Sequence, residues 1–550
     1  MKTTAALLAG AAAVVAATAG GNCSKPYVTS EALQGLVRLE DLLAGSQTLQ
    51  DIADAHGGNR AFGGGGHNAT VDWLYDTLAA TGYFDVVKQP FVELFSAGSA
   101  TLSSSSSSSG EKVYTPKPLT YTPGTDGQTL SRPVVAVAEL GCEAADFPAG
   151  VAGNIALVLR GDCNFAQKAS LAKAAGAAAA IVYNNVPGGV AGTLGAASDA
   201  HAPIVGISQE EGESILSALA SASPETPLVL DLFIESIVEN RTNYNVIAET
   251  KQGDKDNVLV LGGHSDSVYE GPGINDDGSG SVGIWAVARA LTGFRVKNAV
   301  RFAFWGAEEF GKLGSYYYVK QLNRTGETEI AKIRAYLNFD MIASPNYVYG
   351  IYDGDGSAFN FSGPAGSDQI ERDFEDFFKA NGLPSVPSVF SGRSDYAGFI
   401  ENGIPSGGLF TGAEVPKTAE EARLFGGEAG APLDANYHQA GDTVANLDHG
   451  AFLTNTKAIA NSVAKYAMSW AGLPDVHLPQ RRWSADRHRA LHRSNARGLA
   501  GHGHAHAHSG PCGEVGGFDV REKVRERGGR EGERKRVGGT IGKRVYIRFK

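Results

Sequence analysis

Side chains that can bind a metal ion follow several apolar, strand-like runs of this sequence. The run Val258–Gly263 leads directly into His264, and the acidic pair Asp276–Asp277 follows between glycines. Three further stretches of this kind contain Glu308 and Glu309 after Ala299–Trp305, Asp340 after Ala335–Phe339, and His438. Ligands of open α/β sheets bind beyond the carboxyl ends of the strands. The sequence therefore predicts a metal site built from imidazoles and carboxylates at one edge of a sheet.

The residue types favour zinc and hydrolysis. Mixed nitrogen and oxygen ligation suits zinc, and a pair of divalent cations needs a bridging carboxylate. A further carboxylate that binds no metal must accept the proton of the attacking water. The pair Glu308-Glu309 can supply one ligand and one base, because neighbouring side chains point in different directions. Taken singly, these stretches have ordinary interpretations, since Asp-Asp-Gly is usually a turn; their combination in one α/β region indicates a site.

The combined motifs resemble the di-zinc aminopeptidases related to aminopeptidase Y and the bacterial leucyl aminopeptidases. The matching motifs are His264-x-Asp266, Asn275-Asp276-Asp277-Gly278-x-Gly280, Glu308-Glu309, Asn338-x-Asp340-Met341 and Tyr437-His438-x-x-x-Asp442. The resemblance implies an α/β fold, in which a mixed β-sheet is flanked by helices (the zinc exopeptidase fold), and two Zn²⁺ ions per chain. The metal ligands that it implies are His264, Asp276, Glu309, Asp340 and His438. Asp276 would bridge the two ions, His264 and Asp340 would complete one site, and Glu309 and His438 the other.

The same resemblance implies roles for residues that bind no metal. Glu308 would be the general base and acid, and Tyr437 would donate a hydrogen bond to the developing oxyanion. Asp266 and Asp442 would orient the ligand imidazoles, and Asp277 would shape the backbone through a cis Asp276-Asp277 peptide. Two more segments are assigned by analogy: Ser391–Tyr396 resembles a loop beside the amino-terminus pocket, and the side-chain pocket is expected near Tyr349–Phe361 and Phe390–Thr411.

A second module precedes these motifs. Short β-type runs and an Ala-rich helix fill residues 130–235, where no metal-type or nucleophile motif occurs. Cys142 and Cys163 border two of these runs and are predicted to form a disulfide, which should stabilise the fold by about 3 kcal/mol. Two free thiols are the alternative. The segment Gly161–Phe165, followed by Lys168, resembles the protease-associated domain, a non-catalytic small α/β module inserted into peptidases. Lys168 and Lys173 are interpreted as a solvated helix face.

The predicted organisation has five parts. They are a signal peptide (1–19), an N-terminal segment of the peptidase domain (20–125), the protease-associated domain (126–237), the zinc peptidase domain (238–476) and a disordered basic tail (477–550). Apolar spacing predicts helices over Thr29–Ala55, capped by Ser30, and over Thr70–Ala80, with Val86–Phe95 as a strand. The unbroken serine run Ser103–Ser109 is predicted to be an exposed loop.

The N-terminal and compositional features predict passage through a secretory pathway. Lys2, an apolar Ala-rich run and a small-residue cleavage site form the three-part pattern of a signal peptide. Asn-x-Ser/Thr sequons occur at Asn22, Asn68, Asn240, Asn323 and Asn360, and the last four are predicted glycosylation sites. The net charge of −11 combines a basic C-terminal tail with an acidic body, and the acidic body argues against a nucleic-acid partner. We expect a secreted monomer without stable membrane insertion, or alternatively a protein of a vacuolar lumen.

The predicted function is hydrolysis of the N-terminal peptide bond of peptides and proteins, with a metal-activated water and Glu308 as the base. Three alternatives remain open at this stage. A related glutaminyl cyclase would use one zinc ion, and a related carboxypeptidase would act on the other chain end. A non-catalytic protein on the same scaffold would have lost ligands or the base.

Overall fold

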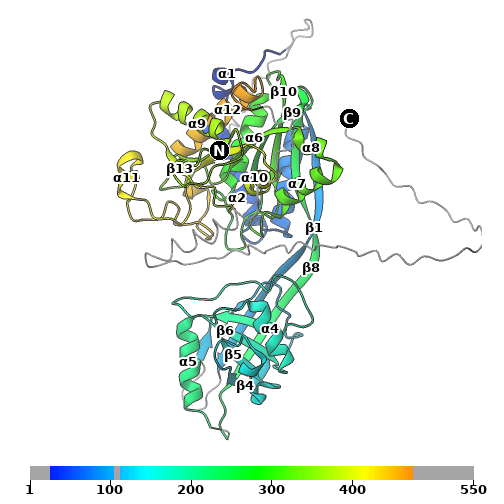
Figure 1. Ribbon diagram of the computed structural model, residues 1–550, viewed down its shortest axis with the longest axis vertical. Coiled ribbons are helices and arrows are strands. Elements are labelled where there is room, and N and C mark those ends of the chain that lie inside the picture. The colour runs from blue at the N-terminus through cyan, green and yellow to red at the C-terminus, as the bar shows by residue number, and fades with distance from the viewer. Residues whose placement is uncertain (1–24, 105–111, 224, 475–550) are drawn as a thin grey trace, which may run out of the picture. The chain divides into compact units, whose positions relative to one another are not determined.

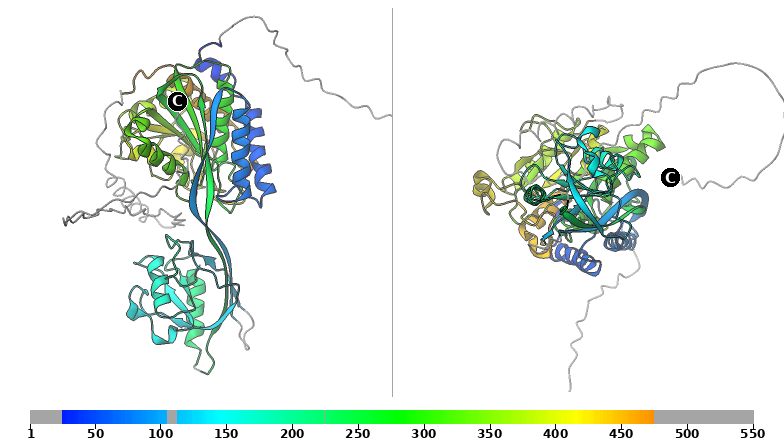
Figure 2. Two further views of the ribbon diagram at one scale, coloured as in Figure 1. Left: turned by 90° about the vertical axis from the view of Figure 1, so that its right-hand side faces the viewer. Right: turned by 90° about the horizontal axis from the view of Figure 1, so that it is seen from below.

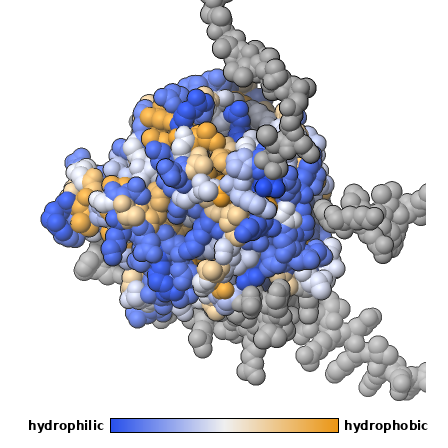
Figure 3. Space-filling view, turned by 90° about the horizontal axis from the view of Figure 1, so that it is seen from above, coloured by the Kyte–Doolittle hydropathy of each residue, from blue (hydrophilic) through white to orange (hydrophobic). Residues whose placement is uncertain are grey.

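The computed structural model describes residues 25–104, 112–223 and 225–474. The predicted signal peptide and basic tail, Asn22 and most of the serine run lie outside the described residues, as do Cys23 and Cys512. Among the described residues, no helix is long and apolar enough to cross a membrane. Figure 3 shows a mostly hydrophilic face on which apolar side chains gather in a few separate patches.

The candidate ligands follow the strands of a large mixed sheet, whose strand order here is β13-β12-β14-β11-β9-β10-β8 (Figure 1). Strands β10, β9, β11 and β14 are parallel neighbours. The strands are β8 (Val229–Thr250), β9 (Asp254–His264), β10 (Asn298–Trp305), β11 (Ile333–Phe339), β12 (Gly350–Tyr352), β13 (Val386–Ser388) and β14 (Ser406–Phe410). Every residue of β11 is buried, as is usual for a parallel strand covered on both faces. The three strands predicted before the ligands are present.

Helices cover both faces of this sheet, and each face has its own apolar core. The first core contains residues of α1 (Ser30–Gln34), α2 (Leu39–Ala55), α3 (Gly65–Ala79), α6 (Gly278–Leu291), α9 (Ser367–Ala380) and α12 (His449–Tyr466). The second contains residues of α7 (Leu313–Thr325), α8 (Glu327–Ala331) and α10 (Tyr396–Glu401). The short helix α11 (Ala419–Phe425) follows β14 in the sequence. Figure 2 shows the blue N-terminal helices against one face of the sheet. The predicted fold class is therefore confirmed.

The N-terminal helices differ from the prediction in their ends. The helix predicted over Thr29–Ala55 is two helices, α1 and α2, and the Thr29 side chain, rather than Ser30, caps the first by accepting from the Ala32 N–H (3.3 Å). Helix α3 begins at Gly65, earlier than predicted. Glycine is needed in its first turn for packing, since a Cβ on Gly66 would collide with the main-chain oxygen of Asn59.

A long two-stranded ribbon was only partly predicted. Strand β1 (Phe84–Ser104) extends well beyond the predicted Val86–Phe95, and it pairs antiparallel along its whole length with β8. Much of both strands is half-buried or exposed, so the apolar alternation that marks a strand is weak there. The ribbon joins the peptidase sheet at β10 and the inserted module at β4 (Leu130–Ala136).

The inserted module contains a parallel sheet of β4, β5 (Ile155–Leu159), β6 (Ala179–Tyr183) and β7 (Ile204–Ile207), with helices α4 (Phe165–Ala174) and α5 (Gln209–Ala220). The short strands β2 (Lys112–Tyr114) and β3 (Lys117–Pro118) pair with β1 and β7. The predicted Cys142–Cys163 disulfide is present. The interpretation of Lys168 as solvated is wrong: its side chain is buried, and its ammonium donates to the main-chain oxygen of Leu140. Lys173 is exposed, as predicted.

Candidate metal centre

Strand register brings the candidate ligands to one edge of the sheet. His264, the last residue of β9, pairs with Trp305, the last residue of β10. The loop after Trp305 carries Glu308 and Glu309, while β11, on the other side of β9, leads into Asp340. Parallel neighbours that end together place their following residues together, which is why three separate motifs form one site.

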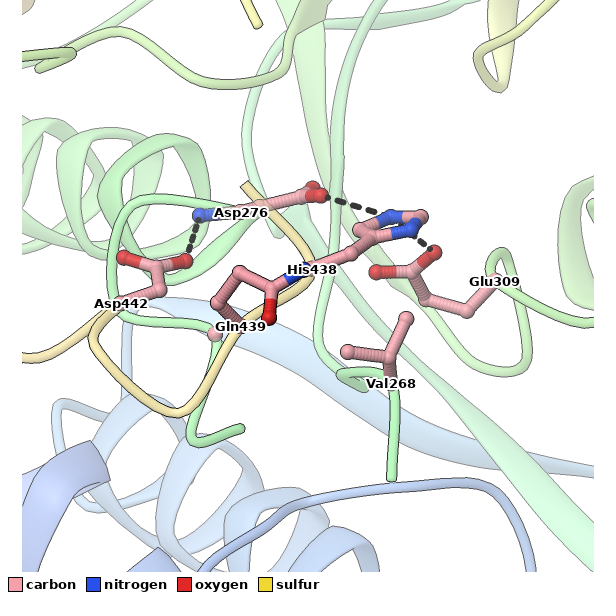
Figure 4. A pocket seen from close by; sticks show the side chains of 7 residues that line it. Val268, Asp276, Glu309, His438, Gln439 and Asp442 are labelled. Carbon is pink, nitrogen blue, oxygen red and sulfur yellow. Dashed lines mark hydrogen bonds and ion pairs between the residues drawn. The ribbon is translucent and has the colours of Figure 1, made fainter. Parts of the chain in front are cut away.

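Five side chains form two groups that share Asp276. One oxygen of Asp276, Oδ1, lies 3.2 Å from His264 Nε2, which is 3.7 Å from Asp340 Oδ1. The other oxygen, Oδ2, lies 3.2 Å from His438 Nε2, which is 3.0 Å from Glu309 Oε2. Figure 4 shows the His438 ring between the Asp276 and Glu309 carboxylates. A carboxylate that presents one oxygen to each group has the geometry of a bridging ligand.

The chemistry of these groups fits divalent cations. Glu309 Oε1, Asp340 Oδ1 and His438 Nε2 are buried and have no hydrogen-bond partner among the described residues, although buried polar atoms are normally paired. Burial alone would lower the pKa of the His438 imidazole, but Glu309 and Asp276 outweigh it and raise this pKa to about 11. Burial raises the pKa of the Glu309 carboxyl, and the Asp276 charge raises it further. The protein thus gathers negative charge that bound cations would neutralise.

Glu308 lies in the same group but makes different contacts. Its N–H donates to Asp266 Oδ1 (3.0 Å), so the main chain at Glu308 is fixed while its carboxylate lines the cavity beside Asp276 and Asp340. Burial raises the pKa of the Glu308 carboxyl well above its usual value, although the charge of His264 opposes the shift. A carboxyl group with a raised pKa is a stronger base than an exposed glutamate, as a general base requires.

A cavity of about 660 Å³ opens beside the metal groups. Its apolar lining consists of Met341, Tyr352, Phe359, Val389, Tyr396, Phe410, Ala413, Val415 and Leu433. Both segments predicted to form the side-chain pocket contribute to it, and residues 412–415 and Leu433 add a third wall that was not predicted. The cavity can take a large apolar side chain next to the metal groups.

Tyr437 borders this cavity and is held by a guanidinium. Its ring stacks on His438, and its hydroxyl oxygen accepts from Arg393 Nη2 (3.0 Å). Arg393 also donates to Glu414 Oε1 (2.7 Å). Because a guanidinium only donates, the Tyr437 hydrogen remains available for another acceptor. Burial raises the pKa of Tyr437 well above its usual value, which keeps this hydrogen in place.

Comparison with known proteins identifies the family. A sequence model described as “Peptidase family M28” matches residues 245–463, and one described as “PA domain” matches residues 130–215. The chain is 52% identical to “Probable leucine aminopeptidase 2” of Trichophyton verrucosum over 82% of its own length and 88% of that protein. It is 54% identical to “probable leucine aminopeptidase 2” of Aspergillus oryzae over 80% of its length and 86% of that protein.

The chain belongs to peptidase family M28. Its fold resembles that of an aminopeptidase from Aneurinibacillus sp. strain AM-1, with a TM-score of 0.60 and 24% identity over 82% of this chain and 98% of that one. A zinc aminopeptidase from Bacillus subtilis gives a TM-score of 0.58 and 24% identity over 78% and 94%. The chain is therefore a metallo-aminopeptidase with an inserted PA domain, as the sequence predicted, and the alternative enzyme classes are set aside.

Asp277 lies next to the candidate ligands of this M28 site, but its carboxylate is occupied by main-chain contacts. Ligand atoms of His264, Asp277 and Asp340 lie within 4.8 Å of one another. However, the Asp277 carboxylate accepts from the N–H groups of His264 (3.0 Å), Gly280 (2.8 Å) and Met341 (3.1 Å). These bonds join β9, α6 and the end of β11. The Asp276-Asp277 peptide is cis, as predicted, and the contacts of Asp277 agree with its predicted role in shaping the backbone.

Asp442 makes contacts other than those predicted. It was expected to orient a ligand imidazole, but its carboxylate accepts from the N–H groups of Asn275 (2.8 Å) and Asp276 (3.0 Å). It therefore holds the main chain of the shared ligand. Asp266 Oδ1 lies 3.6 Å from His264 Nδ1, while the main-chain oxygen of Asp266 is the hydrogen-bond partner of this nitrogen (3.3 Å). The orienting role of the Asp266 carboxylate stays a prediction, and Asp266 also fixes Glu308 as described above.

A chain of hydrogen bonds behind Asp340 was not predicted. Ser394 Oγ donates to Asp340 Oδ2 (2.5 Å) and accepts from Asn338 Nδ2 (2.8 Å). Asn338 in turn accepts from the Tyr336 hydroxyl (3.0 Å). The sequence signal for this contact was the resemblance of the Ser391–Tyr396 loop, which suggested a nearby position but no partner.

Three residues at or beside the site have left-handed backbone conformations. The φ angles are 58° at Ala307, 52° at Met341 and 56° at His438. Such conformations cost of order 1 kcal/mol or more for residues other than glycine. They occur where the chain turns immediately before Glu308, immediately after Asp340 and at a ligand itself, so local backbone strain accompanies the placement of the functional groups.

Proposed function

We propose that this protein is a secreted zinc aminopeptidase that removes apolar N-terminal residues and uses two metal ions bridged by Asp276. The observation that carries the proposal is the division of the Asp276 oxygens between the His264 and His438 groups. Zinc bound there would polarise the peptide carbonyl and lower the pKa of a water molecule toward about 7. His264 and Asp340 would hold one ion, and Glu309 and His438 the other.

The residues of the chain divide the remaining chemistry between them. Glu308 would accept a proton from the attacking water and deliver it to the departing amine. Tyr437, held by Arg393, would donate its hydrogen to the oxygen that becomes negatively charged. The free α-amine of the substrate would lie among the carboxylates at the metal end of the cavity, which limits the reaction to the first peptide bond.

The apolar lining supports a preference for substrates with a large apolar first residue. A leucine side chain has three more carbon atoms than alanine, and burying each is worth about 0.8 kcal/mol. The difference of about 2.4 kcal/mol would give about a 50-fold higher kcat/KM for leucine. The named relatives, called leucine aminopeptidases, agree with this direction.

The test combines metal analysis with matched substrates. Leucine and alanine p-nitroanilides, and the acetylated leucine compound, are assayed with and without a chelator on protein of measured zinc content. We expect two zinc ions per chain, activity that is lost on chelation, and no cleavage of the acetylated compound. One zinc ion per active chain would contradict the bridging role of Asp276.

A variant pair tests the base. Glu308→Ala should retain zinc and lose activity by about 10²- to 10⁴-fold. Glu420→Ala removes an exposed carboxylate paired with Arg423. It should leave zinc content and activity unchanged. Near wild-type turnover in Glu308→Ala would refute the assignment.

Secretion is supported by the exposed positions of four sequon asparagines, Asn68, Asn240, Asn323 and Asn360. Protein collected from the culture medium should lose mass on treatment with an N-glycosidase. Its N-terminus should lie near residue 20. Retention in the cell with an intact N-terminus would contradict this part of the proposal.

A further inference from the structure

A fully buried arginine of the N-terminal segment lies next to the metal centre. Arg60 follows α2 and precedes α3, and its side chain has no exposed surface. Its guanidinium donates to the main-chain oxygens of Ser265, Pro272 (2.9 Å) and Gly273 (2.6 Å). Taking a charged group out of water is costly unless it is fully paired. A buried arginine whose bonds converge on one loop is therefore a specific feature of this site.

The loop that Arg60 contacts connects two metal ligands. It spans residues 265–273, directly after His264 and shortly before Asp276. The main-chain N–H of Arg60 donates to Ser267 Oγ (2.9 Å), and the Asn59 side-chain amide donates to the oxygen of Tyr269 (3.3 Å). The N-terminal segment thus holds the loop at its start, its middle and its end.

A second contact from the same segment fixes the start of the loop. His67 Nε2 lies 2.9 Å from Ser265 Oγ, which itself donates to the oxygen of Trp305 (2.9 Å). The His67 ring must therefore be the donor to Ser265. Burial lowers the pKa of His67 to about 4, so the ring is neutral at neutral pH and Arg60 supplies the positive charge on this side.

The charge of Arg60 also matches its surroundings. Burial lowers the pKa of the Arg60 guanidinium, and the charges of Asp266, Asp442, Asp277 and Asp276 oppose this shift. All four side chains are buried. Attraction between opposite charges is stronger inside a protein than in water, so Arg60 helps to keep these carboxylates close together.

We propose that Arg60 is a positioning residue for the metal centre, whose guanidinium fixes the 265–273 loop and thereby the separation of His264 and Asp276. The inference rests on the proposed zinc function. Three oxygens in different directions match the fixed fork of a guanidinium, whereas a lysine presents one nitrogen atom. The hydrogen bonds of the Arg60 guanidinium go to main-chain oxygens of the loop rather than to the candidate ligands, so Arg60 acts through the loop and through its charge.

The test compares Arg60→Lys and Arg60→Met with a matched buried arginine. Arg334 is 3% exposed and donates to Asn257 Oδ1 (2.7 Å) and to the oxygen of Pro474 (3.0 Å), at the opposite end of β11 from Asp340. Zinc affinity of the full-length proteins is measured by competition with a chromogenic chelator. Cobalt-loaded samples are compared by visible absorption, and folding is checked by circular dichroism.

We expect the Arg60→Lys protein to bind zinc at least about tenfold more weakly, because residues that support metal ligands typically contribute 10- to 100-fold to metal affinity. The visible absorption spectrum of its cobalt-loaded form should also shift. Arg60→Met should bind zinc more weakly still. Excess zinc should restore turnover of Arg60→Lys with KM little changed. Arg334→Lys should lower stability while leaving zinc affinity and the cobalt spectrum unchanged.

A folded Arg60→Lys protein with wild-type zinc affinity and cobalt spectrum would overturn the proposal. If neither Arg60 variant folds, hydrogen exchange of the wild-type protein decides. Removing zinc should then speed exchange in residues 57–64 together with residues 265–273, and a change confined to the loop would overturn the proposal. A wild-type protein that binds no zinc would instead refute the proposed function, and this result is distinct because it appears before any Arg60 variant is made.

Discussion

Replacing Asp442 should weaken both metal sites together. Its carboxylate accepts two main-chain N–H groups, those of Asn275 and Asp276, at 2.8 and 3.0 Å. Asp442→Ala leaves both donors without this partner beside a ligand that is only 5% exposed. A buried N–H group left without a partner costs about 1–3 kcal/mol. A loss of about 3 kcal/mol from the metal-bound state corresponds to roughly 100-fold weaker binding.

The shared position of Asp276 makes the outcome specific. Two dissociation constants are measured by titrating the zinc-free protein against competing chelators, and both should rise in Asp442→Ala. Asp442→Asn should weaken zinc binding by only about tenfold, because the amide oxygen of asparagine can still accept one N–H group. If Asp442 oriented the His438 imidazole, only the site containing His438 would weaken, so one unchanged constant would refute the reasoning.

The control is a second aspartate that caps a helix nearby. Asp448 accepts the Ala451 N–H (2.8 Å) at the start of α12. Asp448→Ala should lower the free energy of unfolding by about 1 kcal/mol and leave both zinc constants unchanged. An equal loss of zinc affinity in this control would show that the assay reports general instability.

Three further outcomes follow from the geometry. Tyr437→Phe should lower kcat by about 10²- to 10³-fold with little change in KM; a change in KM alone would show that Tyr437 only binds substrate. Gly280→Ala should weaken zinc binding and lower Tm, because a Cβ there would collide with the oxygen of Phe339 and the Asp277 carboxylate. Zinc affinity should rise with pH up to about 11, because Glu309 and Asp276 outweigh burial and raise the pKa of the His438 imidazole to about 11, and protons compete with the metal below that pKa; a pH-independent affinity in the competition assay would contradict imidazole ligation.

The gathering of the candidate ligands at one sheet edge could be predicted from sequence because their positions follow from strand order. His264 and Asp340 each stand where an apolar run stops, and the strands that carry them are adjacent and parallel. An apolar run followed by a polar residue is visible in sequence. Several such polar residues come together when neighbouring parallel strands end at the same edge of the sheet, which an α/β fold provides.

Neither the full length of the β1–β8 ribbon nor the burial of Lys168 could be predicted from apolar patterns in the sequence. The ribbon strands alternate poorly in hydrophobicity because both of their faces are partly exposed over much of their length. Lys168 has the same type and spacing as a surface lysine. Its burial depends on the Leu140 oxygen, which lies in a separate segment of the chain and accepts its ammonium hydrogen.

The supporting contacts of the metal centre were missed for a related reason. Motifs identify side chains that touch the metal, but Asp442 and Arg60 act on main-chain atoms, which every residue has. Nothing in Gly58-Asn59-Arg60-Ala61 indicates that the arginine is buried. Such a contact becomes visible only when two distant segments are placed side by side.

This distinction bears on where the peptidase domain begins. Arg60 and His67 lie before the inserted PA domain, whereas every candidate ligand lies after it. Helices α2 and α3 also share an apolar core with α6, the helix that starts immediately after Asp277. The loop between His264 and Asp276 thus lies after the PA domain in the sequence, but it is held by hydrogen bonds from residues that precede this domain. We therefore propose that the segment with α2, Arg60, His67 and α3 belongs to the peptidase domain because it completes the support of the candidate metal centre.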